Sequence, residues 1–127
     1  MVQVLPSEAE FAVVLAEGDL DDDQLLTAYE KYLQRDTAPL TLWDLSKARL
    51  DQIDAVALRA LARRVAELGK RVRSRNARSA VVCARPEDFG LARMLMMYLV
   101  VEGYPVRIAA FMNRDEAKAW LRGDDAE

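Results

Sequence analysis

The sequence predicts an α/β fold: a four- to five-stranded, mostly parallel sheet with an N-terminal hairpin, flanked by four helices. Short apolar segments typical of buried strands alternate with longer segments whose apolar residues recur at helical spacing. The helical segments begin or end at recognisable capping residues. At 127 residues, the chain has the length of one domain. We therefore expect a single domain over residues 1–123, followed by a frayed acidic tail over residues 124–127.

The first two strands are expected to form the hairpin. Val2–Leu5 and Phe11–Ala16 are short apolar segments, and the turn predicted between them is Pro6–Ala9. Glu17 and Gly18 are expected to end the second strand.

The helix after the hairpin has a strong start signal. Asp21 can cap it, Gln24 stands three residues later, and apolar residues recur from Leu25 onward to about Arg35. The carboxylates of residues 21–23 lie in the first turn, where negative charge favours the helix dipole. We prefer this role to metal binding.

The middle of the chain is predicted to form another strand and another helix. The nearly continuous apolar segment Leu40–Leu45 predicts a strand buried in a parallel sheet. The next helix is expected to be capped by Asp51 or Asp54 and to be ended by Gly69, since glycine is common just past a helix end.

The last third adds two strands and two helices. Ser79–Ala84 and Val106–Phe111 are the strands. Pro86 suits the first turn of a helix that reaches about Glu102. Asn113 is expected to cap the final helix.

The helix after Pro86 is the most unusual feature, because Arg93 is its only charged residue between Phe89 and Val101. A helix that is apolar on every side must be covered by its own fold, by a second copy or by a ligand. We expect Arg93 to pair with a carboxylate such as Asp44 or Asp88; the alternatives are that it extends to the surface or contacts an anionic ligand. The candidates for a partner or apolar-ligand interface are Leu91, Arg93, Met94, Met97 and Tyr98.

Three segments carry a family resemblance through their order and spacing. They are Leu42-Trp43-Asp44-Leu45, then Phe89-Gly90-Leu91-Ala92-Arg93-Met94 with Tyr98, then Phe111 followed by Asp115-Glu116-Ala117 and Ala119-Trp120-Leu121. Together they resemble the small bacterial STAS-like domains, also called SpoIIAA-like after the anti-sigma-factor antagonist. The resemblance covers nearly the whole chain.

This resemblance implies a sheet flanked by helices, a fold shared with CRAL-TRIO lipid carriers, and no established enzymatic activity. In the antagonists, a serine at the start of a helix is phosphorylated and switches partner binding. The nearest match is Ser46, which is therefore a phosphorylation candidate. The chain reads Asp44-Leu45-Ser46-Lys47 where the antagonists have an Asp-Ser-Ser-Gly-like turn.

Ligands of open α/β sheets gather at the carboxyl ends of the strands. By this rule the candidate ligand- or anion-binding residues are Asp44, Ser46, Lys47, Arg85 and Asn113. These polar residues could equally satisfy loop and cap amides. A strand-end aspartate such as Asp44 could also accept a phosphoryl group beside Mg²⁺, although the last strand ends without the lysine that such pockets use.

Composition excludes several classes of function. Histidine is absent and Cys83 is the only cysteine, so we expect no zinc site, no histidine-based catalysis and no cofactor. No apolar segment is long enough to span a bilayer and no secretion signal is present, so we expect a cytoplasmic protein.

Eight cations between Arg59 and Arg78 form a basic stretch. A net charge of −3 and the absence of aromatic residues from this stretch argue against nucleic-acid binding. We interpret the stretch as a solvated helix face and loop.

The function favoured by the sequence is a non-catalytic protein-interaction or regulatory domain that forms a homodimer or binds a protein partner through the apolar helix. The first alternative is a carrier that holds a small apolar ligand or lipid between the sheet and the same helix. A Mg-dependent phosphoacceptor at Asp44 is the least favoured alternative.

Overall fold

Strands and helices alternate along the chain in a computed structural model that describes residues 2–8, 11–35, 39–70 and 77–123. The elements are β1 (Val2–Glu8), β2 (Phe11–Asp19), α1 (Asp22–Arg35), β3 (Leu40–Arg49), α2 (Ala55–Gly69), β4 (Arg78–Val82), α3 (Pro86–Val101), β5 (Arg107–Phe111) and α4 (Arg114–Arg122). The five strands form one sheet in sequence order, with β1 antiparallel to β2 and the other pairs parallel. The predicted α/β class, hairpin and mostly parallel sheet are confirmed. The tail predicted over residues 124–127 lies outside the described residues.

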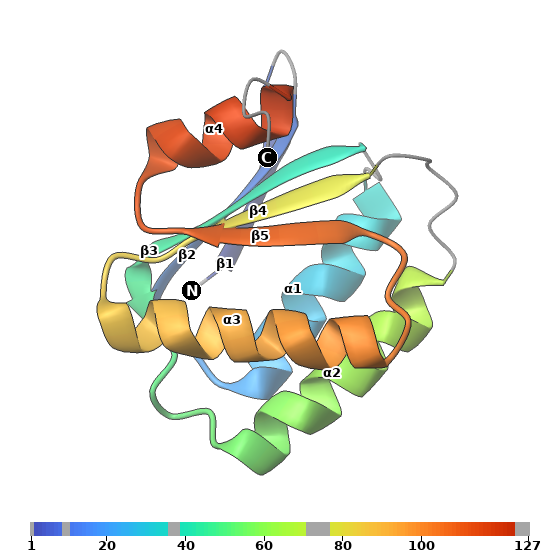
Figure 1. Cartoon of the computed structure of the whole chain (residues 1–127). Helices are drawn as coiled ribbons and strands as arrows, with labels where there is room; N and C mark the ends of the chain where they lie inside the picture. The colour runs from blue at the N-terminus through green and yellow to red at the C-terminus, as the bar shows by residue number, and fades with distance from the viewer. Residues whose placement is uncertain (1, 9–10, 36–38, 71–76, 124–127) are drawn as a thin grey trace.

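The sheet separates two apolar layers. Figure 1 shows α4 on one face of the sheet and α1, α2 and α3 on the other. Successive side chains of a strand point to opposite faces. Val13 accordingly packs with Trp120 and Leu121 of α4, whereas its neighbour Ala12 packs with Tyr29 of α1 on the other side. Both faces of the central strands are buried, which explains their nearly continuous apolar sequence.

Three strand boundaries predicted from the sequence are wrong. β1 continues past Pro6 to Glu8, β2 continues past Gly18 to Asp19, and β3 continues past Leu45 to Arg49. β2 and β3 keep pairing in parallel beyond the point where β4 leaves β3. Hydrogen bonds between distant segments therefore extend these strands through residues that look locally like strand ends.

Most of the predicted helix signals are confirmed. Asp21 and Gln24 form a reciprocal capping box at α1. The Gln24 amide nitrogen lies 2.8 Å from the Asp21 side-chain oxygen, and the Asp21 amide nitrogen lies 2.9 Å from the Gln24 side-chain oxygen. Asp54, rather than Asp51, caps α2 by accepting from the Ala57 amide at 2.8 Å. Asn113 caps α4 by accepting from two backbone amides.

Gly69 has a role different from the predicted helix stop. It is the last residue of α2, and Lys70 after it keeps right-handed backbone angles. A Cβ atom at Gly69 would overlap the ring of Tyr104 and approach the Tyr29 hydroxyl to 3.1 Å. Glycine is therefore required here for close packing of α2 against the segment that follows α3, not for a left-handed turn.

Candidate functional site

The apolar helix α3 is only partly covered by its own chain. Asp88, Ala92 and Leu99 are buried against the rest of the domain, and the predicted interface residues Leu91 and Tyr98 are half-buried. The outward side consists of five exposed residues, which we call the α3 stripe: Arg93, Met94, Met97, Val100 and Val101. Met97, Val100 and Val101 are 70%, 77% and 78% exposed. The helix α3 is thus buried on one side and exposed to solvent on the other.

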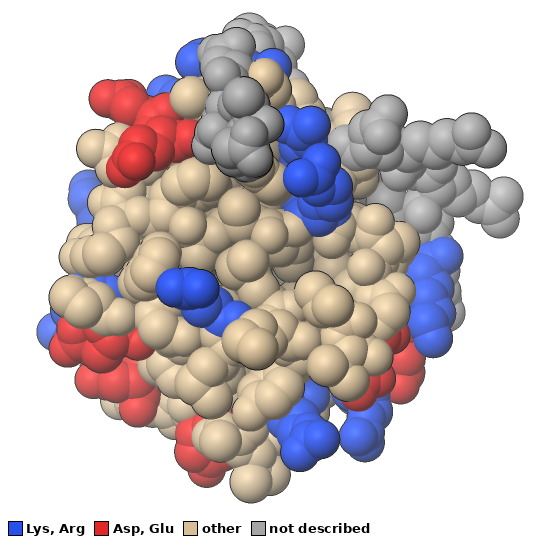
Figure 2. Space-filling view, viewed as in Figure 1, with Lys and Arg blue, Asp and Glu red and all other residues tan. Residues whose placement is uncertain are grey.

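The α3 stripe lies on a face of the molecule with few charges. Figure 2 shows this face, seen as in Figure 1, as a broad, mostly uncharged surface over α3 and β5, with cationic side chains (blue) within it and most other charged side chains at its margin. Among the described residues, Val56 and Met112 are the other large hydrophobic residues that are exposed. Contiguous exposed apolar surface of this kind marks interaction sites, whereas single exposed residues do not.

The predicted pairing of Arg93 with Asp44 or Asp88 is wrong. The guanidinium of Arg93 lies 5.8 Å from the centre of the Phe89 ring. Within the part of the chain that the structure describes, Arg93 forms no ion pair, because Asp44 and Asp88 bind other arginines. Among the described residues, Arg93 is therefore a cation without a carboxylate partner, beside the apolar part of the stripe.

Asp44 lies in β3 beside the last residue of β4, and its side chain is bound by Ser46 and Arg114. Its Oδ1 accepts hydrogen bonds from the Ser46 amide at 3.0 Å and from the Ser46 hydroxyl at 2.6 Å. Its Oδ2 accepts from Arg114 of α4 at 3.0 Å. Asp44 is buried, so these bonds offset the cost of removing its charge from water. These hydrogen bonds connect β3 to α4. They involve both Asp44 and Ser46, which the sequence names as binding candidates.

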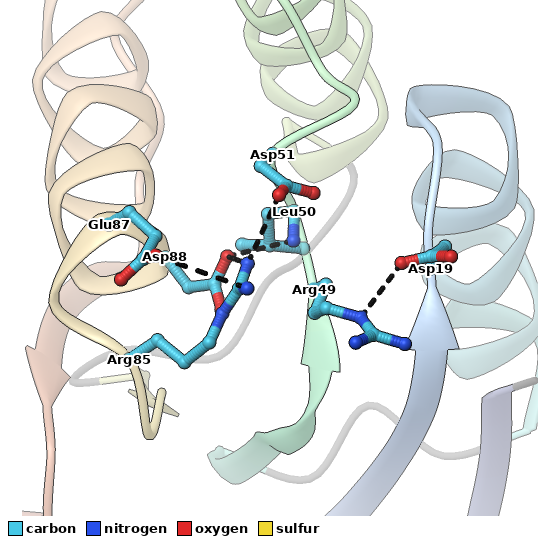
Figure 3. A network of polar contacts seen from close by, with 7 residues as sticks. All are labelled: Asp19, Arg49, Leu50, Asp51, Arg85, Glu87 and Asp88. Carbon is cyan, nitrogen blue, oxygen red and sulfur yellow. Dashed lines mark hydrogen bonds and ion pairs between the residues drawn. The ribbon is translucent and has the colours of Figure 1, made fainter.

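Arg85 belongs to a second network, shown in Figure 3, at the start of α3. It donates two hydrogen bonds to Asp88, at 2.7 and 3.0 Å, and lies 3.5 Å from Asp51. Asp88 is 1% exposed and also accepts from the Leu50 amide at 2.8 Å. Burial alone would raise the pKa of Asp88, but the hydrogen bonds from Arg85 and Leu50 hold this pKa below its ordinary value. The network fastens α3 to the end of β3.

The candidate rim residues take part in separate contacts. Arg85 is occupied by carboxylates, Asn113 caps α4, and Lys47 is exposed. No group of three or more His, Cys, Asp or Glu side chains is placed to hold a metal ion within the described ranges. Anion binding and phosphorylation of Ser46 stay predictions.

Three arginines in the described part of the basic stretch contact other parts of the fold. Arg59 lies over the Tyr98 ring, with its guanidinium carbon 5.7 Å from the ring centre, and Arg63 lies 3.9 Å from Glu102. Arg78 donates to the Trp120 carbonyl at 2.9 Å. Arg71, Arg73 and Arg75 lie outside the described residues.

Sequence reasoning missed two arginines. Arg114 binds Asp44, and its position directly after the cap residue Asn113 was a usable signal, since it opens a helix near the strand ends. Arg107 is exposed at the start of β5, which the sheet order places at an edge. No local pattern distinguishes it from an ordinary surface cation.

Cys83 should be unreactive in the folded protein. It is completely buried, and burial raises the pKa of its thiol to about 12, with Asp88 and Asp44 acting in the same direction. We expect no reaction with a disulfide reagent at mildly alkaline pH until denaturant is added. Rapid labelling of the native protein would contradict this prediction.

The raised pKa of Cys83 makes the stability of the folded protein depend on pH in alkaline solution. The pKa of this thiol in the folded state lies above its ordinary value of 9.0, so the contribution of the protonated thiol to stability is complete below that pH. This contribution is lost as the pH rises toward 12, and the raised pKa of Tyr29, also about 12, acts in the same sense. Urea titrations at increasing alkaline pH should show the decline.

No family model matches the chain, and no curated protein matches it in sequence. Among solved structures, it is similar to the anti-sigma factor antagonist SpoIIAA in its unphosphorylated form, with 14% identity, 97% of each chain covered and a TM-score of 0.48. Within the described residues, no helix is long and apolar enough to cross a membrane.

Proposed function

We propose that the protein is a non-catalytic protein-interaction domain that self-associates through the α3 stripe. The observation that carries the proposal is the exposure of Met97, Val100 and Val101 on one side of a single helix. Burial of such surface against a second copy is favourable in proportion to the apolar area removed from water. Specific docking surfaces have an apolar centre of this kind with polar residues around it.

The spacing of the stripe is compatible with a second copy as the partner. Arg93, Met94, Met97, Val100 and Val101 stand at −4, −3, 0, +3 and +4 relative to Met97. A two-fold axis at Met97 that makes the two helices antiparallel would place residue 94 against residue 100 of the copy. It would also place Arg93 near position 101 of the copy and near the negative end of its helix. This arrangement buries the same residues of both copies, as an isologous interface requires.

The absence of catalysis is supported by the chemistry of the available groups. The chain has no histidine, and burial raises the pKa of its single thiol to about 12. Both carboxylate oxygens of Asp44 already accept hydrogen bonds, from Ser46 and Arg114. Neither residue is positioned as an activated nucleophile.

Met97→Asp tests the proposal. Light scattering should give the mass of a dimer for the natural chain at micromolar concentration, twice 14.3 kDa. Two carboxylates would face each other at the axis in the variant, so its dissociation constant should rise about 100-fold, as expected for a loss of roughly 3 kcal/mol. The midpoint of unfolding should change little at low protein concentration, because Met97 is 70% exposed.

Two further variants sharpen the experiment. Val56→Asp introduces the same charge at an exposed residue of α2 and should leave the dimer intact. Val101→Asp would lie opposite Arg93 in the antiparallel arrangement, so it should be tolerated or should tighten association. A natural chain that stays monomeric at micromolar concentration would overturn the proposal, and disruption by Val101→Asp alone would overturn the antiparallel geometry.

A further inference from the structure

An apolar cavity of about 100 Å³ lies between the sheet and the helices α2 and α3. The sheet contributes Leu45 and Val81 to its lining, α2 contributes Leu61, and α3 contributes Ala92 and Leu95. Well-packed interiors contain few voids larger than a water molecule, and an apolar cavity of ~150 Å³ stays dry and takes up benzene. An apolar cavity of comparable size in this core is suited to the end of an apolar molecule.

A larger groove of about 400 Å³ adjoins this cavity. It lies between the second half of α3 and the segment 104–108, which leads into β5. Four residues line both the cavity and the groove: Met96, Leu99, Tyr104 and Ile108. The cavity and the groove therefore share a wall formed by these four residues. Met96 is unbranched and flexible, so a change of its rotamer can join them. Together they reach the ~300–1,000 Å³ typical of small-molecule sites.

The groove carries positive charge without a counter-charge. Its charged lining residues are Arg93 and Arg107, and no carboxylate lines it. Within the part of the chain that the structure describes, neither guanidinium forms an ion pair. Guanidinium groups next to apolar surface bind carboxylates through strong, charge-assisted hydrogen bonds. The remaining lining is apolar or aromatic apart from backbone groups.

We propose that the groove and the cavity form one binding site for a small amphiphilic carboxylate with an aliphatic tail. The tail enters the cavity past Met96, and the carboxylate accepts hydrogen bonds from Arg107 and Arg93 at the mouth of the groove. The cavity is apolar and the mouth is cationic, so the ligand has one anionic end and one apolar end. This site goes beyond the proposed self-association, because Arg107 and the cavity residues lie outside the α3 stripe, although the groove and the stripe share Arg93, Met97 and Val100.

Calorimetric titration of the full chain with octanoate tests the site. Octanoate should bind, whereas octanol and octylamine should bind at least about tenfold more weakly, since one of them lacks the charge and the other reverses it. Arg107→Gln should weaken octanoate binding about tenfold. The matched control is Arg64→Gln, which removes an exposed cation of α2 and should leave the affinity unchanged.

The tail is tested separately from the head group. Ala92→Leu fills part of the cavity and should reduce octanoate affinity. If this variant does not fold, the affinity of the natural chain for carboxylates of increasing chain length gives the same information. Affinity should rise with each methylene until the cavity is full and then fall. Equal binding of octanoate and octanol, no effect of Arg107→Gln, or no dependence on chain length would each overturn the proposal.

Self-association and ligand binding are distinguished by Met94→Asp. Met94 belongs to the α3 stripe but does not line the groove. Self-association would cover Arg93, Met97 and Val100 of the groove, so a Met94→Asp variant that stays monomeric should bind octanoate at least as tightly as the natural chain. Loss of octanoate binding in Met94→Asp would contradict the assignment of the site to the groove and cavity. A monomeric natural chain that binds octanoate would leave this site intact and remove the proposed self-association.

Discussion

Replacing Asp88 with alanine should lower the free energy of unfolding by about 3 kcal/mol, the largest loss that we expect from any single polar residue of this chain. Asp88 is 1% exposed and accepts hydrogen bonds from the Leu50 amide and from Arg85. Its removal leaves a buried backbone N–H without an acceptor and detaches the start of α3 from the end of β3. Urea unfolding followed by circular dichroism measures the change.

Two comparisons separate this effect from a general loss of charge. Glu87→Gln alters an exposed neighbour that lies 3.9 Å from Arg85, and it should change stability by less than about 0.5 kcal/mol. Acid sensitivity provides the second comparison. The pKa of Asp88 is lowered in the folded state, so its contribution is present above the ordinary carboxyl pKa and is lost as the pH falls below it. Asp88→Ala should lack that part of the acid-induced loss. Equal stability of Asp88→Ala and Glu87→Gln would show that the network is not needed.

Gly69→Ala should destabilise the protein by about 1 to 3 kcal/mol, as overpacking does, although alanine is normally the better helix former. The added methyl group would overlap the Tyr104 ring, whose Cδ1 lies 2.8 Å from the ideal Cβ position. Displacement of this ring would also stretch the 2.9 Å hydrogen bond between the hydroxyls of Tyr104 and Tyr29. Thermal unfolding gives the measurement.

Gly90→Ala is the matched control for Gly69→Ala. Gly90 lies in α3, and a Cβ atom there would meet nothing within 4 Å. The same substitution should therefore raise stability, by up to about 1 kcal/mol. Opposite signs for the two variants would establish that Gly69 is required for packing. A stabilising Gly69→Ala would mean that Tyr104 moves aside at little cost.

Much of the fold was predictable because its signals are local. The capping box of Asp21 and Gln24 and the cap at Asn113 depend on residues within one turn of each other. The buried strands were recognisable because their apolar residues are contiguous. Strand ends were not predictable to the same degree, since β3 extends to Arg49 only through pairing with the distant β2.

The contrast between local signals and contacts of distant residues is clearer still at the candidate sites. Asp44 and Ser46 were both named as binding candidates; Asp44 accepts hydrogen bonds from Ser46, two residues away, and from Arg114, which lies 70 positions away. Arg85 was chosen as an anion binder, yet its guanidinium is occupied by Asp88 and Asp51. Which cation neutralises which carboxylate depends on the packing of whole elements, and sequence spacing contains little information about that.

The sequence by itself determined that one long helix has too little charge to be solvated on all sides, because composition alone sets how much of its surface is apolar. Only the tertiary structure decided which side remains exposed, that Arg93 is left without a carboxylate, and that a cavity lies beneath Leu95. The physical reason is that helix periodicity and capping are local interactions. Burial, ion pairing and cavity shape are instead set by contacts between segments far apart in the chain.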